Sequence, residues 1–112
     1  QEIQKKLAKF AEERDWDQFH SPKNLVMALT SEVGELNEFF QWLTEEQSSI
    51  KDDSAKTDEI RQEIADIFIY LLRLADKLDI DIEEAVREKI EINAKKYPID
   101  LSKGNAIKYN RR

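Results

Sequence analysis

Apolar residues recur every three or four positions along much of this chain, which is the spacing of one face of an α-helix. Only two Gly and two Pro occur among 112 residues, so long stretches contain no helix breaker. The alternating Val, Ile and Thr runs that are typical of strands are missing. The length suits one small domain, and we therefore predict a single all-α domain over residues 1–112.

Four helices are predicted, the first three from apolar residues at helical spacing and the fourth from the residues at its ends. They cover about residues 2–14, 22–43, 58–78 and 82–96. Ser21 followed by Pro22 is a typical helix start, with a hydroxyl cap before a proline in the first turn. Asp81 with Glu84 three residues later resembles a capping box, and Pro98 stops the last helix. A domain this short buries a modest core, so a partner subunit is expected to complete a four-helix bundle.

Two segments fall outside this helical pattern. The polar residues 44–57 lack periodicity and are expected to form a mobile loop, and the basic residues 103–112 are expected to be a tail with little order. The net charge of −6, from 18 basic and 24 acidic residues, argues against broad binding to nucleic acid or to an anionic membrane. Without cysteine, disulfides and thiolate metal sites are excluded. Because no signal peptide or membrane span is visible, we expect a cytoplasmic protein.

The second predicted helix carries acidic side chains at or beside its apolar stripe. With Leu25 at zero and about 100° per residue, the stripe spans roughly 0° to 80°. Its members are Leu25, Leu29, Val33, Leu36, Phe40 and Leu43. Glu32 falls near about 340°, inside the broader apolar face, while Glu35 near about 280° borders it beside Trp42. A carboxylate that leans into a core is costly unless its charge is offset.

The third predicted helix repeats this pattern. Glu63 borders its apolar stripe near about 300°, and Asp66 and Tyr70 fall near about 240° and 280°. Ala65 and Ile69 belong to a second apolar patch, with Leu72, on the same helix. A helix that is apolar on most sides is buried on most sides, which suggests a subunit interface.

Four carboxylates that converge would repel one another and resist desolvation, so a cation or protonation must relieve them. Oxygen ligands without His or Cys suit Mg²⁺, or alternatively Mn²⁺. Such an ion leaves positions for substrate phosphates, which indicates metal-assisted hydrolysis of a phosphoanhydride. The alternative is that these acids are solvated edge residues, since a chain with 24 acids contains some pairs at helical spacing by chance.

The stretch "SEVGELNEFFQW" followed by "EIADIFIY" resembles the MazG-like nucleotide pyrophosphatases, whose signature is a Glu-x-x-Glu helix and a later Glu-x-x-Asp helix. "FAEERDWDQFHSPKNL" and "INAKKYP" support the resemblance, which is greatest to the dCTP pyrophosphatase branch. It implies an all-helical homodimer or homotetramer that hydrolyses a deoxynucleoside triphosphate to the monophosphate and pyrophosphate. It further implies that Glu32, Glu35, Glu63 and Asp66 hold Mg²⁺, with Glu35 acting on the attacking water.

The resemblance also implies substrate contacts. Trp16 and Trp42 would shape a base pocket, and Tyr70 would lie near the sugar and phosphates. The residues that would face the triphosphate are Lys89, Asn93 and Lys96. Two positions depart from the family pattern. Ser31 stands where many members have a glutamate, and Leu7 stands where a relative's pocket has a histidine, which leaves the preferred base open.

Other readings of these residues compete with the resemblance. Trp16, Trp42 and Tyr70 could be plain core residues. Lys89, Asn93 and Lys96 could form a solvated helix face, and the lone His20 could be a structural residue. Among enzymes, the alternative is a sibling hydrolase on the same scaffold, such as a dimeric dUTPase. A non-catalytic helical oligomerisation or regulatory module, whose acids only confer solubility, is the alternative from a different class.

Overall fold

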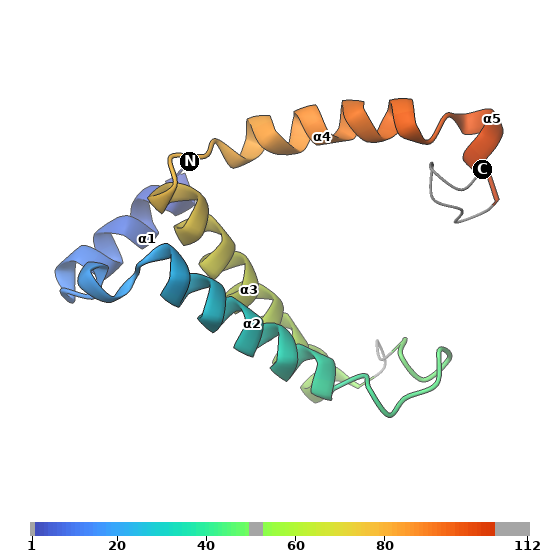
Figure 1. Ribbon diagram of the computed structural model, residues 1–112. Helices are drawn as coiled ribbons and strands as arrows, with labels where there is room; N and C mark the ends of the chain where they lie inside the picture. Colours follow the sequence, from blue (N-terminus) through green and yellow to red (C-terminus); the bar gives the residue numbers. More distant parts are fainter. Residues whose placement is uncertain (1, 50–52, 105–112) are drawn as a thin grey trace. The chain divides into compact units, whose positions relative to one another are not determined.

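The computed structural model describes residues 2–49 and 53–104, and within these ranges the chain is helical and contains no strand. This confirms the predicted all-α class (Figure 1). The elements are α1 Glu2–Glu13, the 3₁₀ helix η1 Asp17–Phe19, α2 Pro22–Glu38, α3 Ser54–Lys77, α4 Ile82–Lys96 and the short α5 Ile99–Ser102.

Short polar side chains cap the longer helices at their starts. The Ser21 hydroxyl accepts a hydrogen bond from the Asn24 backbone N–H at 3.2 Å, and Pro22 opens α2. The Asp81 carboxylate accepts from the Glu84 backbone N–H at 3.1 Å, which starts α4. Each cap satisfies a backbone donor that the first turn leaves without an intrahelical partner. Both predicted starts are therefore confirmed.

Two predicted boundaries are wrong. Helix α2 ends at Glu38 rather than near Leu43, because the Phe39 N–H donates to the Leu36 carbonyl and the Phe40 N–H to the Asn37 carbonyl, both three residues back. These tighter bonds interrupt the α-helical ladder.

Helix α3 begins at Ser54, four residues before the predicted start, because the Asp53 side chain accepts from the Lys56 N–H at 3.0 Å. Residues 54–57 therefore belong to a helix and not to the predicted loop, of which 50–52 lie outside the described residues. Of the predicted tail, residues 105–112 also lie outside them.

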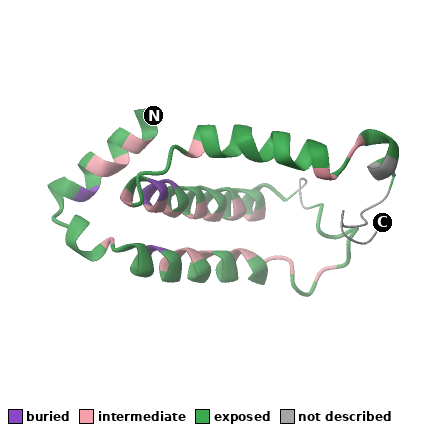
Figure 2. Ribbon diagram, turned by 45° about the horizontal axis from the view of Figure 1, so that its top comes forward, coloured by how far each residue is buried: buried purple, intermediate pink, exposed green. Residues whose placement is uncertain are grey.

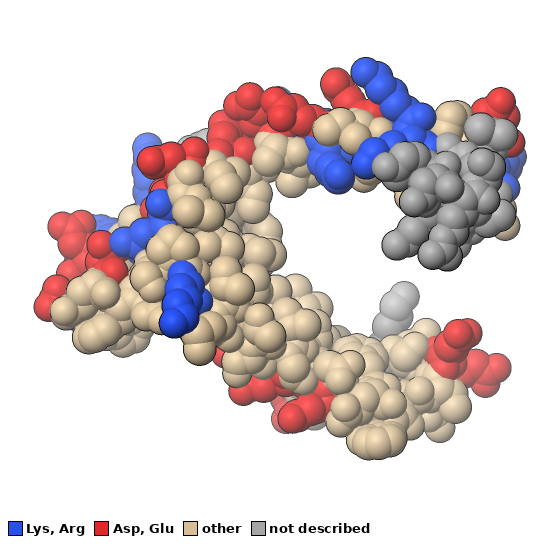
Figure 3. Space-filling model, viewed as in Figure 1, with Lys and Arg blue, Asp and Glu red and all other residues tan. Residues whose placement is uncertain are grey.

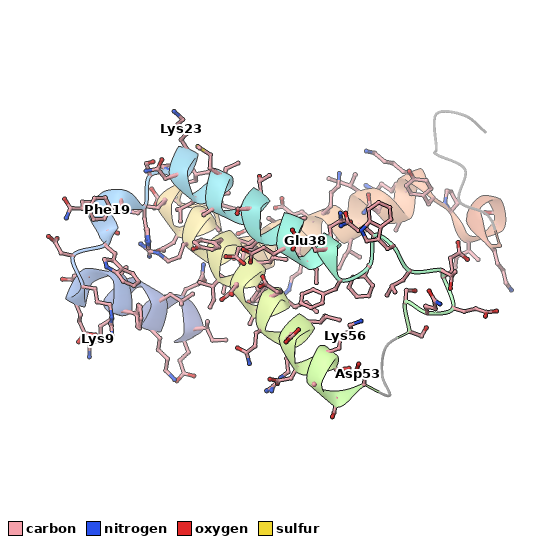
Figure 4. The ribbon with its side chains drawn as sticks, turned by 90° about the horizontal axis from the view of Figure 1, so that it is seen from below. Lys9, Phe19, Lys23, Glu38, Asp53 and Lys56 are labelled. Atoms are coloured by element: carbon pink, nitrogen blue, oxygen red, sulfur yellow. The ribbon has the colours of Figure 1, made fainter. Side chains whose placement is uncertain are left out.

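The chain forms two compact units, residues 1–79 and 80–112. In the first unit, α2 and α3 run antiparallel along each other, and α1 packs against α3 (Figure 1). Lys23, near the start of α2, and Lys56, near the start of α3, mark opposite ends of this pair (Figure 4). The prediction of a single domain stays a prediction.

The core of the first unit is small and lies where α1 meets the start of α2 and the end of α3 (Figure 2). Its buried apolar side chains are Ala11, Leu25, Leu72 and Ala75. Much of the remaining apolar surface of α2 and α3 is exposed within this chain, and uncharged side chains cover much of the face that Figure 3 shows.

The predicted apolar stripes are wider than the contact between α2 and α3. Val33, predicted to be a core residue, is 47% exposed, and Ile64 and Phe68 of α3 are exposed as well. In contrast, the flanks that carry Glu32 and Glu63 are partly buried. The helices thus meet along the acidic edge of each stripe, and the other edge is left uncovered.

The second unit contains α4 and α5. Arg87 and Glu83 form an ion pair at 2.7 Å along α4, and Val86 and Ile90 are exposed one turn apart. No described helix of either unit combines the length and the apolar character that a membrane crossing requires.

Candidate metal centre

Three acidic side chains meet between α2 and α3. Glu32 comes from α2, and Glu63 and Asp66 come from α3, one helical turn apart. One carboxylate oxygen from each lies within 4.8 Å of the other two, so a single cation could contact all three. Glu32 and Glu63 are partly buried, whereas Asp66 is exposed. The two sequence motifs therefore converge as predicted.

Two of these carboxylates, those of Glu32 and Glu63, lie close to each other. Glu32 Oε2 and Glu63 Oε2 are both buried and unpaired. A hydrogen bond that protonated Glu32 donates to the Glu63 carboxylate raises the pKa of Glu32 from 4.5 to about 7, and burial and the neighbouring Glu35 add to this effect. Because two carboxylates at this distance cannot both stay charged without compensation, they must share a proton or bind a cation. The oxygen-only donor set fits a hard divalent ion such as Mg²⁺ or Mn²⁺.

Glu35 lies one turn after Glu32 on α2 and is exposed. Its carboxyl group is close enough to contribute to the raised pKa of Glu32, but it is not among the three acids whose oxygens lie within 4.8 Å of one another. The structure therefore brings three of the four predicted ligands together, with the fourth beside them. The metal-binding and catalytic roles of Glu35 stay predictions.

A cavity of about 250 Å³ adjoins the acidic residues. The cavity lies between α1, α3 and the connector formed by residues 14–21. It shares Asp66 with the acidic trio, which is the name used below for Glu32, Glu63 and Asp66. The lining residues are Leu7, Phe10, Ala11, Trp16, His20, Asp66, Ile69, Tyr70 and Arg73. An apolar, aromatic lining with a few polar groups is typical of small-molecule sites. Of the predicted substrate residues, Trp16 and Tyr70 line this cavity.

The other predicted substrate residues belong to other elements of the chain. Trp42 follows the end of α2 and is 86% exposed, so the helical position beside Glu35 that the sequence predicted for it is wrong. Lys89 and Asn93 are exposed and Lys96 is partly buried on α4, in the second unit. Their substrate contacts stay predictions.

Sequence reasoning missed an arginine that lines the cavity. Arg73 is only 4% exposed, and its guanidinium forms ion pairs with Asp17 at 2.9 Å and with Asp76 at 3.2 Å. Its position between Leu72 and Leu74 was the available signal, because an arginine amid buried apolar residues requires a carboxylate partner. Burial lowers the pKa of the neighbouring His20, and the charge of Arg73 contributes.

Comparison with known proteins agrees with this geometry. The chain is 44% identical over 110 residues to dCTP pyrophosphatase 1 of Bos taurus and 41% identical to that of Homo sapiens. Each alignment covers 97% of this chain but 65% of the relative, so the chain spans less than two thirds of their length. The crystal structure of a pyrophosphatase from Archaeoglobus fulgidus superimposes with a TM-score of 0.79 at 40% identity, covering 87% of this chain and 90% of that one.

The model of the MazG-like family matches residues 27–111. This range contains both acidic motifs, with all three residues of the trio and Glu35, together with Tyr70 from the cavity wall. It covers well over half of the chain, and the helical architecture and the paired acids agree with it. The chain therefore belongs to the MazG-like family.

Proposed function

We propose that this chain is a divalent-metal-dependent nucleoside triphosphate pyrophosphatase that hydrolyses a deoxynucleoside triphosphate to the monophosphate and pyrophosphate. The observation that carries this proposal is the pair of unpaired, facing carboxylates of Glu32 and Glu63 beside Asp66. Relatives named dCTP pyrophosphatase support the activity and favour a dCTP-like substrate. Removal of unwanted or modified nucleotides from the cytoplasmic pool is the corresponding role.

The acidic side chains would hold Mg²⁺ or Mn²⁺, with Glu35 as the fourth ligand. A bound ion of this kind polarises phosphoryl oxygens and makes a coordinated water more acidic. Glu35, exposed beside Glu32, would orient the attacking water and accept its proton. The water oxygen forms a bond to the α-phosphorus while the bond from that phosphorus to the bridging oxygen breaks, and pyrophosphate leaves.

The cavity would bind the base. Its volume of about 250 Å³ is below the range of roughly 300–1,000 Å³ that drug-sized ligands occupy, so it suits one ring system rather than a whole nucleotide. Trp16 forms part of its wall, and Tyr70 would contact the sugar and phosphates. Because Asp66 borders both the cavity and the acidic trio, a base bound there would place its phosphates toward the metal centre. Trp42 would add stacking on the base.

Cationic and amide side chains of the second unit would contact the triphosphate. These are Lys89, Asn93 and Lys96, which occupy one face of α4 at spacings of four and three residues. They supply positive charge and hydrogen-bond donors for an anionic ligand. With a net charge of −6, the chain as a whole suits a small anionic substrate held at such a local site, and it does not suit binding of nucleic acid or a membrane surface.

A substrate panel tests this proposal. The protein is incubated with each dNTP, and with dUTP, in the presence of Mg²⁺, and the phosphate products are separated. Monophosphate together with pyrophosphate is expected, with dCTP-type nucleotides turned over fastest. Preference for dUTP would indicate the dUTPase-like hydrolase instead. Release of orthophosphate, or no turnover with any nucleotide, would contradict the proposal and favour a non-catalytic helical module.

The active form would be a homodimer or homotetramer. Ile64 and Phe68 form an exposed apolar stripe on α3, and Val26 and Val33 form a second one on α2. Contiguous apolar surface on a chain of this size is typical of a subunit interface. A second copy that covers these stripes would complete the predicted four-helix bundle.

Placing a charge on the exposed apolar stripe of α3 should disrupt the oligomer. Phe68→Glu should convert it to the monomer, because a carboxylate at the centre of an apolar interface is desolvated without a partner. Light scattering coupled to gel filtration measures the mass, and Asp58→Asn, an exposed change elsewhere on α3, serves as the control. A wild-type protein that elutes at the monomer mass of 13.2 kDa would contradict the oligomer.

A further inference from the structure

We propose that the ion pair between Arg73 and Asp17 positions the connector of residues 14–21 and so sets the shape of the adjoining cavity. Asp17 and Arg73 are not among the residues assigned to the metal. They would act through Trp16, directly before Asp17, and His20, three residues after it, which both line the cavity. The inference rests on the proposed function, because it assigns these two charged residues to substrate affinity rather than to the chemical step.

The Arg73 side chain is almost completely buried, and its charge is compensated from two elements. Its Nη2 donates to Asp17 Oδ1 at 2.9 Å, and its Nη1 donates to Asp76 Oδ2 at 3.2 Å. Asp76 lies three residues further along α3, so that contact remains within one helix. Asp17 lies 56 residues away in sequence, so that contact joins the connector to α3. Lys77 adds a second cation on the same Asp17 oxygen at 2.7 Å.

The backbone of the connector transmits this anchoring to the cavity wall. The Phe19 N–H donates to the Trp16 carbonyl at 2.8 Å, and the His20 N–H donates to the Asp17 carbonyl at 3.1 Å. These bonds close the short 3₁₀ turn η1 around Asp17. Displacement of Asp17 would therefore move Trp16 and His20 together. Trp16 and His20 thus share one turn with Asp17, while the Trp16 N–H donates to the Ala11 carbonyl at 2.9 Å and ties the start of the connector to α1.

The Trp16 side chain is only partly covered by the rest of the unit. Trp16 is 46% exposed, and its ring packs in an edge-to-face arrangement with Phe10, at 5.6 Å between ring centroids. An indole that is almost half exposed is less firmly fixed than one in a packed core, so the anchoring of the connector bears on its position. The hydrogen bond from Lys77 and the ion pair with Arg73 lower the pKa of Asp17, so its carboxylate stays charged at neutral pH.

The test compares two variants that remove a carboxylate from the same buried guanidinium. Asp17→Asn removes the contact to the connector, whereas Asp76→Asn removes the contact within α3. If the pair positions the cavity wall, Asp17→Asn should raise KM for the nucleotide by about tenfold or more while kcat changes by less than about threefold. Asp76→Asn should leave KM within about twofold of the wild type. Asp17→Glu, which keeps the charge, should restore part of the affinity.

A purely structural role gives a different result. In that case both variants would lower the midpoint of thermal unfolding, and at temperatures where they are folded, as judged by circular dichroism, both would have the wild-type KM. Equal KM changes in the two variants, or an unchanged KM in folded Asp17→Asn, would overturn the inference.

A second measurement is independent of catalysis. Trp16 and Trp42 are the two tryptophans, so a Trp42→Phe background leaves Trp16 as the single reporter. In that background, Asp17→Asn should shift the Trp16 emission to longer wavelength and increase its quenching by acrylamide, and Asp76→Asn should not. This readout needs no nucleotide, so it holds even if the substrate panel fails. An unchanged Trp16 signal in the folded Asp17→Asn variant would also overturn the inference.

Discussion

Replacing Glu63 with glutamine should abolish nucleotide hydrolysis, lowering kcat by about 100-fold or more, while the helical content stays unchanged. The substitution keeps the shape of the side chain but removes the charge that a divalent ion requires. It also introduces an amide that can donate to the Glu32 carboxylate, whose Oε2 is buried without a hydrogen-bond partner. Pyrophosphate release measures turnover, and circular dichroism measures the helical content.

The control for this substitution is Asp58→Asn, which removes a negative charge from the same helix. Asp58 is exposed and pairs with Arg61 at 3.6 Å, away from the acidic trio. Its loss should leave turnover within about twofold of the wild type, since exposed ion pairs contribute little. Retained turnover in Glu63→Gln would refute the assignment of Glu63 to the metal centre. Equal losses in both variants would show that the effect is one of overall charge.

The helical architecture could be predicted because local signals determine most of it. Apolar residues at helical spacing located α1, and the side chains of Ser21 and Asp81 marked the starts of α2 and α4, which the structure confirms. The end of α2 was not predictable in this way, because Phe40 and Leu43 continue the apolar period past Glu38. The backbone there turns through hydrogen bonds three residues back, a choice that the apolar pattern does not encode.

The candidate site was predictable to a similar extent. Helical spacing placed Glu32 and Glu63 on one flank of their apolar stripes, and the structure brings them together with Asp66. The angular position of a residue around one helix does not tell which arc meets the neighbouring helix. Val33 lies on the predicted core stripe but is 47% exposed within this chain. The burial of Arg73 was likewise missed, since its partner Asp17 lies in another element and 56 residues away.

The protein without metal should lose stability as the pH rises, and Glu32 should cause part of this loss. The neighbouring Glu63 raises the pKa of Glu32 from 4.5 to about 7. Because the folded state then binds the Glu32 proton more tightly than the unfolded state, its stabilising contribution is fully present below about pH 4.5. It is lost as the pH rises through about 7. For a partly buried group, a shift of this size corresponds to about 1–3 kcal/mol in the free energy of unfolding.

Chemical unfolding in EDTA, followed by circular dichroism between pH 4 and 8, measures this dependence. Glu32→Gln should show a shallower fall over the same range, because an amide does not titrate and can donate to Glu63 without a proton from solvent. At pH 8, adding Mn²⁺ or Mg²⁺ should restore stability to the wild-type protein, since the cation replaces the proton between the facing carboxylates. It should restore little to Glu32→Gln. Identical pH profiles for the two proteins, together with no response of the wild type to either metal, would mean that the fold does not hold the Glu32 and Glu63 carboxylates close enough to repel each other. Glu32 and Glu63 would then have no role in binding a cation.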